Sequence, residues 1–165
     1  RVLASPVHQH FAEGAPASGH GVQWLAAPQL VADVVHSGPV GRMASDIAAL
    51  LADGGRSGVL AVTLAEEMPV QETVELVGAL RERLGRRPEA VVVNGLYPAV
   101  PPGLSAAADG AELWELRRRV NDRELERLRE RWDGPLLELP LLPVDPGPAL
   151  VVALGAHLER ALRRS

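Results

Sequence analysis

The chain contains no lysine, because all 17 of its basic residues are arginines. Any mechanism that needs a lysine, such as a phosphate-binding loop holding a nucleoside triphosphate, is therefore excluded for these 165 residues alone. Cysteine is also absent, which excludes disulfides, thiolate metal sites and thiol nucleophiles. Aromatic residues make up only 3% of the chain, so leucine, valine and alanine must supply most of a hydrophobic core.

Long apolar runs and strong net charge are missing as well. No run reaches the length of a membrane span, and the first residues do not form the apolar segment of a signal peptide, so we expect a cytoplasmic protein. The net charge of −4 provides no basic footprint for nucleic acid. The length fits a single domain over residues 1–165, and we expect residues 1–13 to be its least structured part. His8 and His10 lie in that segment without further ligand residues in a metal-binding pattern, so we expect no metal site.

The stretch from Gly58 to Asn94 is typical of a strand–helix–strand unit. Two short apolar runs rich in β-branched residues, Val59–Leu64 and Ala90–Val93, favour strands buried on both faces of a parallel sheet. The segment between them has apolar residues at helical spacing, and Pro69 suits the first position of such a helix. The pattern predicts an α/β fold with a mostly parallel sheet flanked by helices.

Polar side chains stand where these two strands are expected to end. Glu66 and Glu67 follow the first strand, and Asn94 follows the second. In parallel sheets, ligands bind beyond the carboxyl ends of the strands, so these residues are candidates for ligand contact. An asparagine amide offers both a donor and an acceptor to one edge of a purine base, although a capping asparagine in a turn is the alternative for Asn94.

The rest of the chain favours four further helices and one strand. Residues 22–53 indicate two helices broken at Ser37–Pro39, and their apolar residues are expected to pack in the core. A charged helix is expected over residues 112–132, with Leu113 and Leu116 among its inward residues and with Glu124 in a salt-bridged solvent face. A third strand follows at residues 136–139, and a final helix at residues 149–162, with Leu150, Leu154, Leu158 and Leu162 facing inward.

Four ordered motifs carry a resemblance to a known family. PASGH at residues 16–20, VTLAEEMPVQETVEL at 62–76, VVVN at 91–94 and ELPLLP at 138–143 occur in the order found in the ArsA-type ATPases. That family includes the arsenite-pump ATPase and the ATPases that target tail-anchored membrane proteins. The resemblance covers roughly Gly14 to the C-terminus. It implies a partial fold of the P-loop nucleoside triphosphatase kind, with ATP and Mg²⁺ as cofactors.

The resemblance also implies roles for particular residues. Asn94 matches the asparagine that contacts adenine, and Glu66 matches a glutamate at the nucleoside end of the ligand. Pro16, Ser18, Gly19 and His20 match the switch II loop that senses the nucleotide state, and we expect a loop from Gly14 to Gly21. The aspartate of that loop is replaced by Gly14. The turn at residues 141–143 resembles the loop that closes over the adenine.

The phosphate-binding half of the family's domain has no counterpart here. Its glycine-rich loop and lysine would precede residue 1, so we expect this chain alone to be inactive, as the distal portion of an ArsA-like ATPase domain. The alternative is a non-catalytic subunit that pairs, as a homodimer or heterodimer, with a complete homologous ATPase. An unrelated α/β domain is a third, weaker alternative. The arsenite-binding version of the family uses cysteines, which this chain lacks, so metalloid export is disfavoured. The client protein is not indicated.

Overall fold

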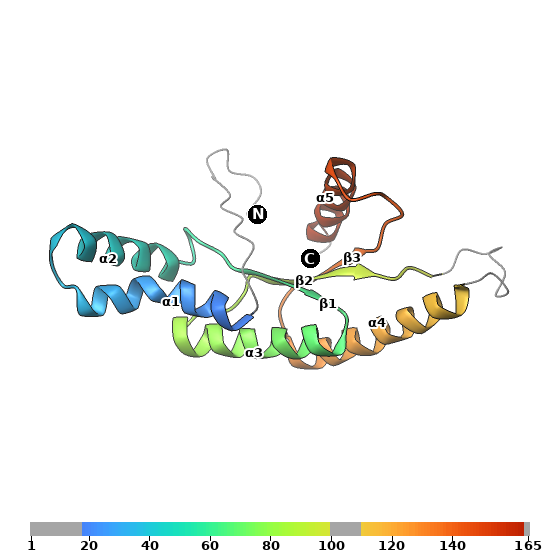
Figure 1. The fold of residues 1–165 in the computed structure, drawn as a ribbon, viewed down its shortest axis with the longest axis horizontal. Helices are drawn as coiled ribbons and strands as arrows, with labels where there is room; N and C mark the ends of the chain where they lie inside the picture. The colour runs from blue at the N-terminus through green and yellow to red at the C-terminus, as the bar shows by residue number, and fades with distance from the viewer. Residues whose placement is uncertain (1–17, 100–109, 164–165) are drawn as a thin grey trace.

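A computed structural model describes residues 18–99 and 110–163, and Figure 1 shows their arrangement. The elements follow one another as α1 (Ser18–Val34), α2 (Gly38–Ala52), β1 (Leu60–Leu64), α3 (Glu67–Leu84), β2 (Ala90–Leu96), α4 (Ala111–Arg131), β3 (Leu136–Pro140) and α5 (Pro148–Leu162). The α/β class predicted from the sequence is confirmed. Residues 1–13, expected to be the least structured, lie outside the described residues.

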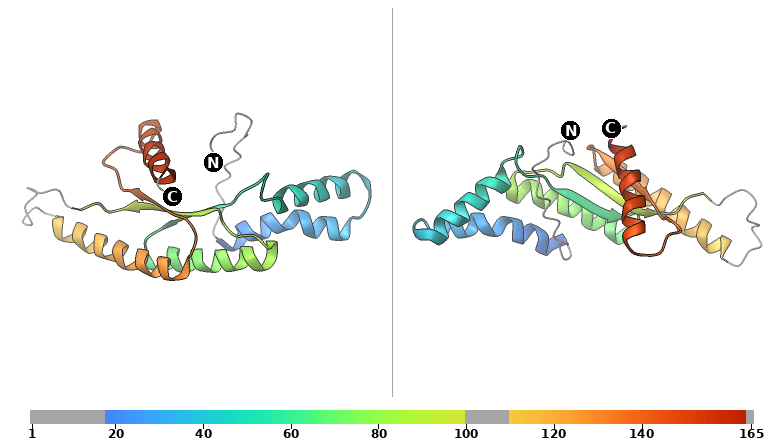
Figure 2. Two further views of the ribbon diagram at one scale, coloured as in Figure 1. Left: turned by 180° about the vertical axis from the view of Figure 1, so that it is seen from behind. Right: turned by 90° about the horizontal axis from the view of Figure 1, so that it is seen from above.

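The three strands form one parallel sheet in the order β1-β2-β3. Helices α3 and α4 are the crossovers between successive strands, and both lie along the same side of the sheet (Figure 1). Helix α5 stands on the other side, as the two further views in Figure 2 also show. All three strands therefore end at the same edge of the sheet.

The better-covered face of the sheet packs against α3 and α4. Its largest cluster of buried residues joins alternate strand residues to the two helices: Ala61, Ala65, Val70, Val91, Val93, Leu125, Leu128 and Trp132. On the other face, a smaller cluster of Ala90, Val92, Leu137 and Leu139 packs against Leu154, Leu158 and Ala161 of α5. Leu162, which was expected to face inward with Leu154 and Leu158, is 41% exposed.

Strand β1 is buried on only one of its faces, contrary to the expectation of burial on both. Its alternate side chains Leu60, Val62 and Leu64 are 57%, 68% and 42% exposed. The physical reason is that the α5 residues pack on β2 and β3, and none of the described helices supplies β1 with an equivalent cover on that side. The strand pattern was correct, but the depth of burial depends on what lies above the sheet.

Helix α3 begins earlier than the position of Pro69 suggested. Its first residue is Glu67 and its N-cap is Glu66, so Pro69 occupies the third helical position and not the first. A proline is tolerated there because the first four N–H groups of a helix have no partner within the helix. The helix ends at Gly85, whose left-handed φ of 62° suits a glycine. The N–H of Gly85 donates to the carbonyl of Arg81.

Helices α1 and α2 form a hairpin that extends away from the end of the sheet (Figure 1). The predicted break at Ser37–Pro39 is confirmed, since α1 ends at Val34 and α2 begins at Gly38. The expected core packing is wrong for much of the hairpin, because Trp24, Val34 and Met43 are 57%, 78% and 59% exposed. Helix α1 packs against α3, and the end of α2 accepts a hydrogen bond from Arg86, whereas these exposed side chains of the hairpin meet solvent.

The two halves of α4 differ in their surroundings. Its second half is buried against the sheet through Asn121, Glu124, Leu125 and Leu128. Its first turns run past the sheet (Figure 1), so Leu113 and Leu116, expected to face inward, are exposed. The amphipathic pattern predicted the helix correctly, but only part of its apolar stripe meets a neighbour.

Among residues 18–99 and 110–163, no helix combines the length and the apolar character needed to cross a bilayer.

Candidate functional site

Asn94 lies inside β2, although the sequence analysis placed it after the strand. The strand continues to Leu96, and Asn94 pairs in register with Leu64, the last residue of β1. On the side of β3, the register shifts between Val93 and Leu96. The left-handed φ of 71° at Gly95 accommodates this irregularity, and bulges of this kind turn side chains away from the regular sheet direction.

The Asn94 side chain is half-buried and not sealed inside the core. Within residues 18–99 and 110–163, its carboxamide has no hydrogen-bond partner. A carboxamide carries two donor hydrogens and an acceptor oxygen, so the group is able to recognise a complementary edge of a ligand. Its partial exposure leaves the carboxamide able to contact a ligand at the carboxyl edge of the sheet.

Glu66 stands at the carboxyl end of β1, where α3 begins. It is the N-cap residue of α3, but its side chain makes no capping hydrogen bond. Its carboxylate lies 4.0 Å from a guanidinium nitrogen of Arg117 on α4, and both side chains are about half exposed. An exposed ion pair at this distance is weak. The carboxylate therefore remains accessible at the same edge of the sheet as Asn94.

A buried side chain that the sequence analysis missed, Asn121 of α4, connects the two strands at this edge. Its Nδ2 donates to the carbonyl of Ala65 at 2.9 Å, and its Oδ1 accepts from the N–H of Tyr97 at 2.9 Å. The residue is 7% exposed. A signal was present in the sequence, because residue 121 shares the helical spacing of Leu125, Leu128 and Trp132 and is the polar member of that stripe.

The chain after β2 and the turn after β3 extend the same edge. Trp114 of α4 donates from its indole Nε1 to the carbonyl of Pro98 at 2.9 Å, and its ring meets Tyr97 edge-on with centroids 4.8 Å apart. The N–H of Leu141 donates to the carbonyl of Leu96 at 2.7 Å. The turn at residues 141–143, predicted to lie near a base, is thus tied to the end of the strand that carries Asn94.

Glu124 is buried, although the sequence placed it on a solvent face. It is 3% exposed, and its carboxylate accepts from Arg123 at 2.9 Å and from Arg127 at 3.3 Å. Arg127 also donates to Gln71 of α3 at 2.7 Å. Arg127 therefore joins α3 to α4 and pairs with the buried carboxylate.

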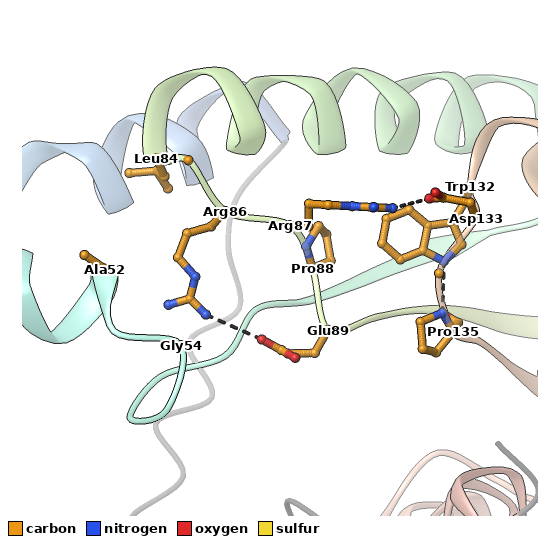
Figure 3. A pocket seen from close by; sticks show the side chains of 12 residues that line it. Ala52, Gly54, Leu84, Arg86, Arg87, Pro88, Glu89, Trp132, Asp133 and Pro135 are labelled. Atoms are coloured by element: carbon orange, nitrogen blue, oxygen red, sulfur yellow. Dashed lines mark hydrogen bonds and ion pairs between the residues drawn. The ribbon is translucent and has the colours of Figure 1, made fainter.

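A hollow of the described residues lies at the opposite, amino edge of the sheet, and Figure 3 shows its lining. It has a volume of about 510 Å³ and is open to solvent. Arg86 pairs with Glu89, and Arg87 pairs with Asp133 while its guanidinium lies 5.0 Å from the centre of the Trp132 ring. Each of the two arginines is paired with an acidic residue of the same lining. We therefore interpret the hollow as a structural contact between the segments that precede β2 and β3.

The residues of the switch-II-like motif are only partly described. Pro16 and Gly14 lie outside the described residues. Ser18, Gly19 and His20 form the first turn of α1, so the expectation of a loop through Gly21 is wrong for residues 18–21. A role for these residues in sensing a nucleotide stays a prediction. In the described ranges, no three His, Asp or Glu side chains gather closely enough to hold a metal ion.

The chain is similar to curated mycobacterial proteins. It is 32% identical over 110 residues to the ATPase BagA of Mycobacterium tuberculosis H37Rv, a match that covers 64% of this chain and 31% of the relative. Relatives from Mycobacterium bovis and from Mycobacterium tuberculosis CDC 1551 match with the same identity and coverage. The chain thus spans about a third of the length of these relatives. No family model matches the chain.

Proposed function

We propose that this chain forms the purine end of a nucleotide pocket of the ArsA type, with Asn94 as the residue that reads the base. The observation that carries the proposal is the half-buried Asn94 carboxamide, without a partner among the described residues, at the carboxyl edge of a parallel sheet. Glu66 lies at the end of the neighbouring strand and faces the nucleoside in this arrangement. The similarity to BagA, a protein named as an ATPase, supports the assignment.

ATP fits this edge only at its base. Adenine offers an acceptor and a donor side by side, which an asparagine amide matches with its own donor and acceptor. The triphosphate and Mg²⁺ require a glycine-rich loop, a lysine and oxygen ligands, and the chain has no lysine. Near Glu66 the cation is Arg117, which already pairs with that carboxylate. We therefore propose base recognition and no hydrolytic step for these 165 residues.

A second candidate is a non-catalytic subunit that pairs with a complete homologous ATPase in the cytoplasm. The exposed apolar side chains of β1, Leu60, Val62 and Leu64, favour it, because parallel sheets are normally covered on both faces. The reading frame upstream of the codon for Arg1 separates the two candidates. An in-frame glycine-rich loop with a lysine supports the ATPase, and a start codon directly before Arg1 supports the subunit.

A calorimetric titration tests the proposal. Mg-ATP is titrated first into the chain alone and then into the chain mixed with intact BagA, with BagA alone as the reference. We expect weak or absent heat from the chain alone and additional binding in the mixture. Asn94→Ala should remove the additional binding, whereas Gln23→Ala, which truncates an exposed amide on α1, should leave it unchanged. Equal binding by Asn94→Ala and the unmodified chain would contradict the assignment of Asn94.

A further inference from the structure

The regular backbone pairing between β1 and β2 ends at Asn94 itself. Its last pair joins Leu64 to Asn94, so Ala65 and Tyr97 lie beyond the regular pairing. The β2 strand is irregular over this stretch, with the register shift between Val93 and Leu96 on its other side. The regular pairing therefore places Asn94 opposite Leu64 but does not extend to Ala65, Glu66 and Tyr97, which lie beyond its last pair.

The Asn121 side chain continues the connection where the ladder stops. One carboxamide accepts from the Tyr97 N–H and donates to the Ala65 carbonyl, at 2.9 Å in both cases. These are the bonds that a neighbouring strand would make with each strand end. The group needs both a donor and an acceptor, so a carboxylate or an apolar side chain of the same size cannot replace it.

The two anchored residues flank the two candidate ligand residues. Ala65 directly precedes Glu66, and Tyr97 follows Asn94 by three residues. Asn121 is buried, so its two hydrogen bonds are shielded from competition by water. Arg117, one helical turn earlier on α4, pairs with Glu66 itself. The face of α4 that carries residues 117 and 121 therefore contacts the edge at three points.

We propose that Asn121 is the positioning residue of the purine site, because it fixes the separation between Glu66 and Asn94. This inference rests on the proposed function, since it assigns a second residue to the same site. Asn121 contacts backbone and not ligand, so it acts through the geometry of the strand ends. Loss of its donor leaves the Ala65 carbonyl without a partner and allows β1 and β2 to separate at the edge.

The test is a nuclear magnetic resonance titration of the whole chain with adenosine and, separately, with guanosine. The side-chain amide signals of Asn94 report binding. Asn121→Asp keeps the size of the side chain but loses the donor to Ala65. Glu124→Gln is the matched control. It also exchanges an amide and a carboxylate at a buried position of α4, but the partners of Glu124 are arginines and not the strand ends. Thermal unfolding of each variant fixes a temperature at which all are folded.

Adenosine should shift the Asn94 signals in the unmodified chain and in Glu124→Gln. In Asn121→Asp, the adenosine affinity should fall about tenfold, the loss expected when one buried hydrogen bond is left unmade, and the preference for adenosine over guanosine should decrease. A purely structural role would lower the unfolding temperature without changing this preference. If Asn121→Asp does not fold, Asn121→Ser, whose single hydroxyl on a shorter side chain cannot bridge both backbone groups, should show the same loss of preference.

The outcomes separate the two proposals. An unmodified chain whose Asn94 signals do not respond to adenosine overturns the purine site and, with it, the role of Asn121. A chain that binds adenosine with equal affinity and preference in Asn121→Asp and Glu124→Gln overturns the role of Asn121 alone. A tenfold loss confined to Asn121→Asp supports both.

Discussion

Arg86 donates from its guanidinium to the carbonyl of Leu51 at 2.6 Å, although 35 residues separate the two in the chain. The same guanidinium donates to the hydroxyl and to the carbonyl of Ser57, at 2.8 and 2.7 Å. The Arg86 side chain thus connects the end of α2 and the turn before β1 to the segment that precedes β2. The planar fork of an arginine makes several such bonds at once, which the single ammonium of a lysine does not reproduce.

Arg86→Lys is therefore expected to destabilise the fold although it conserves the charge. The side chain of Arg86 is only 10% exposed, and a lysine would leave at least one of the part-buried acceptors without this donor. We expect a loss of about 1–3 kcal/mol in the free energy of unfolding, measured by chemical denaturation. Arg83→Lys, on the exposed side of α3, is the control and should change stability by less than about 0.5 kcal/mol. Equal losses in the two variants would contradict the role of the fork.

Two leucines of α4 should respond very differently to truncation. Leu128 is 1% exposed within the main core, so Leu128→Ala should cost about 2–5 kcal/mol of unfolding free energy through lost burial and a cavity. Leu116 is 51% exposed beyond the sheet, so Leu116→Ala should cost less than about 0.5 kcal/mol. Denaturant titrations of both variants measure the difference. A large loss from Leu116→Ala would show that the first half of α4 packs against something.

The parallel strand–helix–strand unit could be predicted because its signal is local. The run Ala90–Val93 is apolar at every position, and the helix before it has a clear apolar stripe. The exposure of Leu60 and Val62 could not be predicted, since it depends on whether a helix lies above β1. That helix would come from a distant part of the sequence or from another chain, and periodicity within β1 carries no information about it.

The sequence pattern indicated where along the chain the candidate residues lie, but not their geometry. Polar residues after apolar runs predicted that Glu66 and Asn94 lie near the carboxyl ends of β1 and β2, and the structure places Asn94 opposite Leu64, while a role for either residue in binding stays a prediction. The extension of β2 through Asn94 depends on the left-handed conformation of Gly95, which a single glycine in a sequence does not specify. The Asn121 bridge was missed because its partners are backbone groups 56 and 24 residues away, which no local pattern identifies.

The Asp133 carboxyl should titrate at a lower pH in the folded chain than in the unfolded chain. The hydrogen bond from Arg87, followed by a backbone hydrogen bond and the positive charge of Arg87, holds the pKa of Asp133 below its ordinary value of 3.8. Because the folded pKa is the lower one, the contribution to stability is complete above the unfolded pKa. It is lost as the pH falls from about 4 through the folded pKa.

Arg87→Gln tests this dependence. The variant should raise the pH at which the Asp133 carboxyl carbon titrates in a nuclear magnetic resonance experiment, because the donor becomes uncharged. Near neutral pH its stability should differ little from that of the unmodified chain, since Asp133 is exposed. An identical titration of Asp133 in both proteins would show that the ion pair with Arg87 does not persist in solution.

The purified chain alone should release no phosphate from Mg-ATP above the rate of the buffer. Transfer of the terminal phosphate depends on positive charge held against the β- and γ-phosphates, and a chain without lysine has no residue for the family's phosphate loop. The assay compares phosphate release by the unmodified chain and by Asn94→Ala, with intact BagA as the positive control. Turnover that Asn94→Ala abolishes would contradict the prediction, because loss of activity on removal of a base-reading side chain places hydrolysis in this polypeptide. Release that is equal in both proteins and disappears on further purification belongs to a contaminating ATPase and agrees with an inactive chain.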